Sequence, residues 1–353
     1  MQRIFITLIS QQAIPNVQYI LELGPFDKYY FLSTEKMERD DKSENIRRAC
    51  NIPEERLSVL VVNEDNYLNI QQMIDLNIPI NDLNQYVVNC TLGTKIMSIA
   101  LFDWFKNITN CQLLYTPIDS NGYKSIINDN VNSKFAQKIS IEKYFMSYGI
   151  KINKISTPSF TKIRSEKILP KFIEMDEGHF KALDYLRKFR DKGFKNYKFN
   201  TDINEVIIFL DYEPESHDNL SKNEVKYLTG GWFEEYCYFK IKEKYALLDA
   251  QIGLGLLIEA TAKNDLDVVF ILNNDLYVVE CKTSLGRDLQ QNTIYKSGAL
   301  IAKFGRAAKS VLLTLQDLRN EGKLLDAIEL RSRQQGVIIK DRTDVLDFDT
   351  VKF

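Results

Sequence analysis

The stretch Asn264–Lys282, NDLDVVFILNNDLYVVECK, decides the fold of the second half of this chain. Two apolar runs, Leu266–Leu272 and Leu276–Val279, flank asparagine and aspartate at positions 273–275. These residue types tolerate the positive φ angles that tight hairpins need. The stretch therefore predicts a β-hairpin with two apolar strands.

Asp267, Glu280 and Lys282 interrupt this apolar hairpin. Side chains alternate along a strand, so Glu280 and Lys282 are expected on one face. A two-residue loop at 273–274 sets Asp267 opposite Glu280, whereas a loop at 274–275 sets it opposite Lys282. Opposed Cβ atoms lie about 5 Å apart, so in either register the two carboxylates can share one divalent cation.

The chemistry of these three residues suits hydrolysis of a phosphodiester. Mg²⁺ or Mn²⁺ would lower the pKa of a bound water and neutralise phosphate charge, while a lysine positions that water or helps to deprotonate it. An edge hairpin that carries a solvated salt bridge would show the same short pattern. The motif alone leaves both interpretations open.

A second motif lies about thirty residues upstream. Gly230–Glu235, GGWFEE, opens a predicted helix. One of the two acids in this segment could complete the metal site. Its apolar positions are expected to pack on the sheet: Trp232, Phe233, Tyr236, Phe239 and Ile241.

GGWFEE, NDLDV and VVECK, in this order and spacing, resemble the PD-(D/E)xK nuclease superfamily, which has the restriction-endonuclease-like fold. The resemblance implies that Glu234, Asp267 and Glu280 hold the metal and that Lys282 serves the attacking water. It leaves Glu234 and Glu235 both open as the helix acid, with the glycine-x-x-aromatic-Glu pattern favouring Glu234. The residue before the aspartate is leucine, where the family name has proline.

Length and composition limit the number of domains and the class of protein. At 353 residues with 44% hydrophobic residues, the chain can form two domains with proper cores. A formal net charge of −2 does not indicate a nucleic-acid binder, so any basic surface must be local. The apolar run Ile252–Ile258 is far short of a membrane span, and Ile4–Ile9 is too short for a signal peptide. Five scattered cysteines and only two histidines argue against a zinc site, and the unpaired cysteine spacing points to a reducing cytoplasm.

The first 120 residues alternate between strand-like and helix-like segments. This alternation predicts a parallel, Rossmann-like sheet with helical crossovers. The expected strands are Ile4–Ile9, Tyr29–Leu32, Leu57–Val62, Tyr86–Asn89 and Cys111–Thr116, and the expected helices are Asn16–Leu23, Glu38–Cys50, Asn69–Asp75 and Thr94–Trp104.

Ligands of such sheets bind beyond the carboxyl ends of the strands. Two polar loops follow strands there, Ser10–Asn16 and Asn89–Lys95, and the second begins a helix whose amides suit an anion. Neither GxGxxG nor GxxxxGK[ST] is present, so a dinucleotide cofactor or an NTPase is not supported. Taken alone, the second loop is better explained by an ordinary strand-to-helix turn with a cap.

Together with the nuclease-like half, the first domain resembles the CARF domains of CRISPR-associated proteins, which sense cyclic oligoadenylates. In that family a polar loop after the first strand and an N-x-[ST]-x-G-[ST]-[KR] stretch after the fourth contact the ligand. By this resemblance the ligand-binding residues are Ser10, Gln11, Thr91, Gly93, Thr94 and Lys95.

The α/β chain is thus expected to hold a CARF-like sensor at 1–135, a connector at 136–205 and a PD-(D/E)xK nuclease domain at 206–353. Further predicted strands are Gly122–Ile127, Lys138–Ser140, Ile208–Leu210, Val311–Thr314 and Val337–Lys340; further helices are Ile141–Tyr148, His179–Arg190, Gln291–Phe304 and Leu324–Gln335; Pro158 and Pro170 suit surface turns.

Basic residues outside the motifs are candidates for nucleic-acid contact. For the run Arg187–Lys198 the pattern favours a solvated helix end, and for each of the others it favours ordinary surface charge. Those that follow the hairpin are Arg287, Lys296, Lys303, Arg306 and Lys309.

The whole chain resembles the ligand-activated effector nucleases of type III CRISPR systems. The resemblance implies a homodimer that binds cyclic tetra-adenylate across its two-fold axis and then, with Mn²⁺ or Mg²⁺, cuts single-stranded RNA and DNA and nicks duplex DNA in antiviral defence. Two alternatives are an ungated restriction-type endonuclease and a nucleotide-sensing regulator with an inactive nuclease fold. The complete quartet of Glu234, Asp267, Glu280 and Lys282 argues against the regulator.

Overall fold

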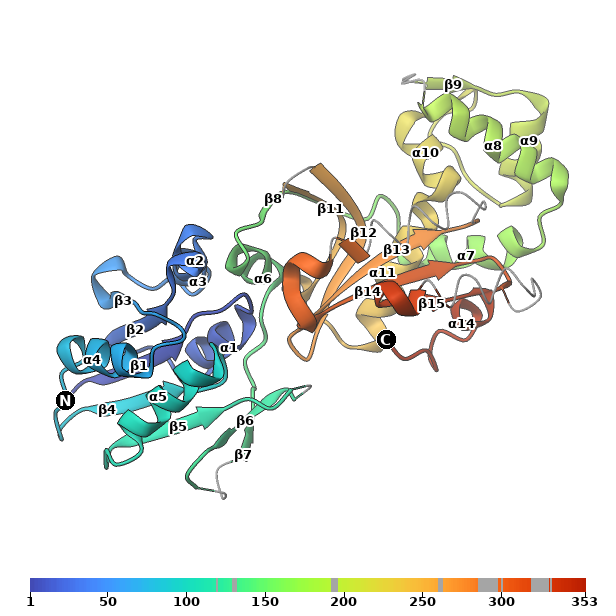
Figure 1. Ribbon diagram of the computed structural model, residues 1–353. Helices are drawn as coiled ribbons and strands as arrows, with labels where there is room; N and C mark the ends of the chain where they lie inside the picture. The colour runs from blue at the N-terminus through green and yellow to red at the C-terminus, as the bar shows by residue number, and fades with distance from the viewer. Residues whose placement is uncertain are drawn as a thin grey trace.

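The computed structural model describes residues 1–118, 120–128, 132–191, 196–259, 263–284, 298–299, 301–318, 330 and 332–353. It contains two large β-sheets joined by a short crossing segment, with a group of helices beyond the second sheet (Figure 1). The described helices include none that is long and apolar enough to cross a membrane. All five cysteines are free thiols.

The first sheet has the strand order β3-β2-β1-β4-β5-β6-β7. Its first five members pair in parallel, which confirms the Rossmann-like prediction, and the last two add antiparallel strands at one edge. The strands are β1 Arg3–Leu8, β2 Lys28–Ser33, β3 Leu57–Val61, β4 Gln85–Asn89, β5 Cys111–Tyr115, β6 Gly122–Ser125 and β7 Asn132–Lys134.

The helices of this domain follow the predicted order, with one difference. The expected helix Glu38–Cys50 is two helices, because Asp41 has a φ of 53° that no α-helix accommodates. They are α1 Ile14–Leu23, α2 Glu35–Arg39, α3 Lys42–Ala49, α4 Tyr67–Asn77 and α5 Lys95–Phe105, with a 3-10 turn η1 at Glu54–Arg56.

The second sheet has the order β15-β14-β13-β12-β11-β8. Its edge strand β8 comes from the segment expected to be a connector, so that segment contributes to the fold of the second half. The strands are β8 Lys151–Ser156, β11 Ile252–Glu259, β12 Lys263–Leu272, β13 Asp275–Lys282, β14 Ala308–Thr314 and β15 Val337–Lys340.

Strands β12 and β13 form the predicted hairpin. Leu272 pairs with Asp275, so the loop is Asn273-Asn274, and both residues have positive φ angles of 53° and 66°. The neighbouring pair Val268 and Val279 continues the ladder toward Asp267 and Glu280. Of the two registers that the sequence allows, the one with Asp267 opposite Glu280 is therefore correct.

Helix α11 (Trp232–Lys244) packs on this sheet, as predicted. Trp232 and Phe233 have no exposed surface, and Tyr236 and Ile241 are also buried. A π-helical turn, η2 (Tyr227–Gly231), precedes it and joins it to the short helix α10 (Lys222–Lys226).

A helical region lies beyond the second sheet, at the side away from the first domain (Figure 1). It consists of α7 Lys162–Ile173, α8 Glu177–Asp191, α9 Thr201–Phe209 and α10, with a small ribbon of β9 Asn196–Lys198 and β10 Asn219–Ser221. The remaining described elements are α6 Ile141–Ser147, the 3-10 turns η3 Asp249–Gln251 and η4 Ala302–Ala307, and α14 Arg342–Leu346.

Three sequence expectations are wrong here. The segment Lys138–Ser140 has no strand pairing, and Ile208–Leu210 is the end of helix α9, which Asn200 caps by accepting the backbone N–H of Ile203 at 2.9 Å. Pro170 lies inside α7 rather than in a turn. It is tolerated near the end of the helix because only one helical hydrogen bond is lost.

Two predicted helices fall mostly outside the described residues. Gln291–Phe304 is described at 298–299 and from 301 onward, where Ile301 and Phe304 are buried as expected. Leu324–Gln335 is described only at 330 and 332–335, which are helical.

The hairpin turn is also one of the contacts between the two halves. The side chain of Asn274, 4% exposed, accepts the Ile139 backbone N–H at 3.0 Å and donates to Asn121 Oδ1 at 3.0 Å and to the Gln137 carbonyl at 3.4 Å. The Gln137 N–H in turn donates to Glu22, near the end of α1, at 2.8 Å. Hydrogen bonds thus connect the first helix of the first domain with the turn of the hairpin.

Candidate active site

The end of the hairpin opposite its turn brings three of the predicted residues together. Lys282 Nζ lies 2.5 Å from Glu280 Oε1 and 3.2 Å from Asp267 Oδ2. Asp267 also accepts the backbone N–H of Cys281 at 2.8 Å, which fixes its carboxylate toward β13. The three side chains are 14% to 26% exposed, so two acids and one cation share a largely dehydrated face of the sheet.

Glu234, in the first turn of α11, is the fourth member. Burial and then the negative charge of Asp267 raise its pKa to about 7, against the opposing charges of Lys226 and Lys282. No hydrogen bond or ion pair joins its carboxylate to another described residue. A desolvated acid beside a second acid is costly unless a cation joins them.

Glu235 is directed elsewhere. Its carboxylate accepts the backbone N–H groups of Ser159 at 2.6 Å and Phe160 at 3.2 Å, and the residue is 4% exposed. These bonds hold the chain that enters α7. The geometry therefore favours Glu234 over Glu235 as the helix acid of the site.

Lys282 is held in its charged form. Burial lowers its pKa, but the charges of Asp267 and Glu280 outweigh burial, and the net effect is a pKa above the ordinary lysine value. For Glu280, burial and Asp267 raise the pKa although Lys282 opposes them. The ammonium therefore provides the counter-charge for this carboxylate pair.

The donor set fits a hard divalent cation. Carboxylate oxygens are the ligands that Mg²⁺ and Mn²⁺ prefer, and Glu234 provides one that has no partner among the described residues. Across the described ranges, no three acidic, histidine or cysteine side chains are already grouped closely enough to hold an ion. The Lys282 ammonium lies in contact with Asp267 and Glu280, so a bound ion would compete with it for their oxygens.

The predicted sensor residues lie at the carboxyl ends of β1 and β4, which pair directly. In the first loop, Ser10 Oγ accepts the Gln12 N–H at 3.1 Å and the exposed Gln11 donates to Asp40 at 3.3 Å. Both side chains therefore lie beyond the carboxyl ends of the strands, where ligands of parallel sheets bind.

In the second loop, Thr91 Oγ1 accepts the Thr116 N–H at 2.9 Å. Gly93 has a φ of 81°, and a Cβ there would lie 2.9 Å from Leu8 Cδ1, so glycine is required. Thr94 caps α5 by accepting the Met97 N–H at 3.2 Å, and Lys95 is exposed in the first turn.

Sequence reasoning missed the buried residues beneath these loops. Thr7, Asn16 and Asn89 have no exposed surface and are hydrogen-bonded to one another: Asn89 Nδ2 donates to Thr7 Oγ1 at 3.1 Å and to Asn16 Oδ1 at 2.9 Å. Asn89 Oδ1 also accepts the Thr91 N–H at 3.0 Å. The available signal was a polar residue inside or at the end of an apolar strand.

Among the basic residues after the hairpin, Lys309 is already paired within the second sheet. Lys309 Nζ donates to the Tyr277 hydroxyl at 2.9 Å and pairs with Asp275 at 3.4 Å. Arg287 and Lys296 lie outside the described residues. Arg187, from the other basic run, donates to Thr283 at 3.0 Å and so contacts the end of the hairpin instead of forming a free helix end.

Comparison with known proteins agrees with this two-part architecture. Residues 4–144 match the family model of the Card1 CARF domain, and residues 221–346 match that of the Card1-like endonuclease domain. No curated protein sequence matches the chain.

Solved structures with similar folds cover nearly the whole chain. Can2 from Sulfobacillus thermosulfidooxidans, solved in complex with cyclic tetra-adenylate, has a TM-score of 0.77 at 21% identity and covers 98% of each chain. Protein VC1899 from Vibrio cholerae has a TM-score of 0.80 at 15% identity, covering 99% of this chain and 96% of its own. A type III CRISPR defence DNA nuclease activated by cyclic oligoadenylate has a TM-score of 0.55 at 15% identity, covering 88% of this chain and 45% of that one.

Fold and site together define a protein that joins a Rossmann-like CARF domain to an endonuclease domain of the PD-(D/E)xK type. The chain belongs to the family of CARF-domain effector nucleases, and both of its domains match the Card1 members of that family.

Proposed function

We propose that this protein is a metal-dependent endonuclease that cyclic oligoadenylate, in particular cyclic tetra-adenylate, activates for antiviral defence in a type III CRISPR system. Its proposed substrates are single-stranded RNA and DNA, which it cuts, and duplex DNA, which it nicks. The observation that carries the proposal is the convergence of Glu234, Asp267, Glu280 and Lys282 at one end of the hairpin β12–β13.

In this proposal Glu234, Asp267 and Glu280 hold a Mn²⁺ or Mg²⁺ ion. When bound, that ion activates water and neutralises charge on the phosphate. Lys282, kept charged by its acidic neighbours, orients the attacking water and stabilises the negative charge that develops on the phosphate. The elements that carry the four groups pack into one apolar core.

The regulatory part of the proposal rests on the two loops that follow β1 and β4. Ser10, Gln11 and the loop Thr91–Lys95 present hydroxyl, amide, backbone and ammonium groups at the site where parallel sheets bind ligands. The similar Can2 structure contains cyclic tetra-adenylate, which supports the same ligand here. A cyclic, two-fold ligand fits an isologous interface, so the active form is proposed to be a homodimer.

The test is cleavage of single-stranded RNA, single-stranded DNA and supercoiled plasmid with Mn²⁺, with and without cyclic tetra-adenylate. Cleavage that needs both metal and ligand is the expected result. Cleavage regardless of ligand would leave an ungated endonuclease, and ligand binding without any cleavage would leave a regulator.

Glu280→Ala is expected to reduce cleavage by at least about 100-fold, because a catalytic ion contributes several kcal/mol and each factor of ten corresponds to about 1.4 kcal/mol. Ligand binding, measured by calorimetry, should stay unchanged, since Glu280 lies on the second sheet. A variant that still cuts at the wild-type rate would show that the metal site is wrong.

A further inference from the structure

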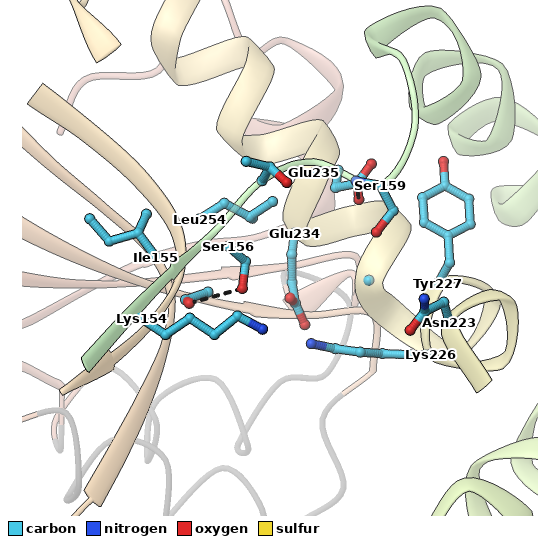
Figure 2. A pocket seen from close by; sticks show the side chains of 13 residues that line it. Lys154, Ile155, Ser156, Ser159, Asn223, Lys226, Tyr227, Glu234, Glu235 and Leu254 are labelled. Atoms are coloured by element: carbon cyan, nitrogen blue, oxygen red, sulfur yellow. Dashed lines mark hydrogen bonds between the residues drawn. The ribbon is translucent and has the colours of Figure 1, made fainter. Parts of the chain in front are cut away.

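A cavity of about 320 Å³ adjoins Glu234 on the side of β8 and β11 (Figure 2). We propose that this cavity binds the phosphate backbone of the nucleic-acid strand through Lys154 and Lys226, next to the site where the strand is cut. The inference rests on the proposed nuclease function and extends it to the groups that hold the substrate.

The two lysines come from different elements and converge. Lys154 lies on β8 and Lys226 ends α10, and Figure 2 shows both ammonium groups and the Glu234 carboxylate pointing toward one another. Ser156 and Asn223 also line the cavity and provide neutral hydrogen-bonding groups. Glu235 lines the cavity too, but its carboxylate accepts the backbone N–H groups of Ser159 and Phe160, which leaves the two ammonium groups available to a phosphate.

Neither lysine forms a salt bridge with a described residue, and both are exposed, although the charge of Lys226 acts on Glu234 and Glu235. Other lysines of this region are paired: Lys240 lies 2.9 Å from Glu166, and Lys162 lies 2.5 Å from Glu243. Unpaired cations at a catalytic cleft are the groups that neutralise phosphates and release counter-ions on binding.

Irregular backbone shapes one wall of the cavity. The pairing of β8 with β11 shifts register between Leu254 and Leu257, and Gly255 has a φ of 54°. A Cβ on Gly255 would lie 2.9 Å from Ser156 Oγ, which donates to the Gly255 carbonyl at 3.2 Å. Bulges of this kind occur preferentially at sheet edges and beside active sites, where they redirect side chains.

The opposite wall uses a second irregular segment. The segment Tyr227–Gly231 separates α10 from α11 and is kinked at Gly230, which has a φ of 153°. It places Lys226 and Glu234 on the same cavity although they belong to different helices. Sharp kinks of this kind form at glycine, which accepts a positive φ.

The cavity extends the catalytic surface in one direction. Asp267, Glu280 and Lys282 lie on β12 and β13, whereas the cavity lies toward β11 and β8, with Glu234 between the two groups. When the reacting phosphate of a nucleic-acid strand lies at the catalytic quartet, a neighbouring phosphate of that nucleic acid would lie at Lys154 and Lys226.

The experiment measures binding separately from cleavage. Fluorescent single-stranded RNA and DNA oligonucleotides are titrated with metal-free protein in EDTA, with cyclic tetra-adenylate present, over a range of NaCl concentrations. Lys154→Gln/Lys226→Gln should bind at least 10-fold more weakly than wild type, and the slope of log K against log salt should fall by about 0.7 for each lost contact. Lys151→Gln, an exposed lysine of β8 that does not line the cavity, is the matched control.

Two further probes identify the ligand. An oligonucleotide with uncharged methylphosphonate linkages should bind wild type and the double variant equally. Millimolar AMP should not displace the charged oligonucleotide. If AMP does displace it from wild type, and the double variant loses this competition but still binds the oligonucleotide normally, the cavity binds small nucleotides and the inference is overturned.

Cleavage with Mn²⁺ separates this inference from the proposed function. If wild type cuts and the double variant cuts with an unchanged KM and unchanged salt dependence of binding, only the inference fails. If wild type binds with the lysine-dependent salt slope but never cuts, the nuclease proposal fails and the strand-binding cavity stands. A raised KM with little change in kcat is the expected outcome.

Discussion

Glu234 has no hydrogen-bonding partner among the described residues, whereas its neighbour Glu235 has two. Adjacent glutamates in one helical turn point in different directions, so one stabilises a chain turn and the other faces the catalytic cluster. In the sequence only the family resemblance favoured Glu234 over Glu235, because the physical distinction depends on where the Ser159–Phe160 backbone passes.

Glu234→Gln is expected to stabilise the metal-free protein above pH 7. The folded-state pKa of about 7 exceeds the ordinary value of 4.5, so between these pH values the unfolded chain binds fewer protons and wild type loses stability as the pH rises. The shift corresponds to at most about 3 kcal/mol, and we expect a gain of about 1–3 kcal/mol at pH 8.

Urea unfolding in EDTA at pH 4, 6 and 8 measures this effect. At pH 4 both states of wild type hold the proton, so the two proteins should differ least there. A stability difference between wild type and Glu234→Gln that is the same at pH 4 and pH 8 would contradict the raised pKa.

Among the elements, the hairpin β12–β13 was predictable in detail. Its alternation, its asparagine loop and the face shared by Asp267, Glu280 and Lys282 all follow from local rules, and two registers could be stated in advance. The choice between them follows from the positive φ of both Asn273 and Asn274. Strand β8 was not predicted, because the segment KINKIS at 151–156 is short and mostly polar and becomes a strand only by pairing with β11.

The two asparagines of the hairpin turn provide a matched pair of variants. Asn274→Gly keeps the positive φ but removes the bonds to Ile139, Asn121 and Gln137, and it leaves the buried Ile139 N–H without a partner. We expect a loss of about 1–3 kcal/mol in the free energy of unfolding. Asn273→Gly, in the exposed position beside it, should change that free energy by less than about 0.5 kcal/mol.

Denaturant titration of both variants tests this prediction. Equal effects of the two substitutions would show that the turn, and not its contact with the first domain, determines the loss.

For the whole molecule, the order of the two domains could be predicted from sequence, and so could the parallel sheet of the first. The contact at the hairpin turn could not, since it joins Asn274 with residues more than 130 positions earlier. The buried network of Thr7, Asn16 and Asn89 was likewise hidden, because it forms only when β1, α1 and β4 are adjacent.

Lys95→Ala tests communication across the molecule. Loss of one charge-assisted hydrogen bond to a phosphate costs about 1.5–3 kcal/mol, so the concentration of cyclic tetra-adenylate that gives half-maximal cleavage should rise by roughly 10-fold or more. Lys28→Ala is the control, because Lys28 lies at the amino end of β2, opposite to the end of the strands at which Lys95 lies. An unchanged activation curve for Lys95→Ala would remove Lys95 from the sensor site.

Strand β8 also limits how these proteins can be recombined. It immediately follows the first domain in the chain but completes the sheet of the second, where it pairs with β11. A chimera that joins a foreign sensor at position 206 would leave β11 as a bare edge, open to pairing with other copies and hence to aggregation. A graft that retains residues 151–156 with the endonuclease half would keep that edge covered.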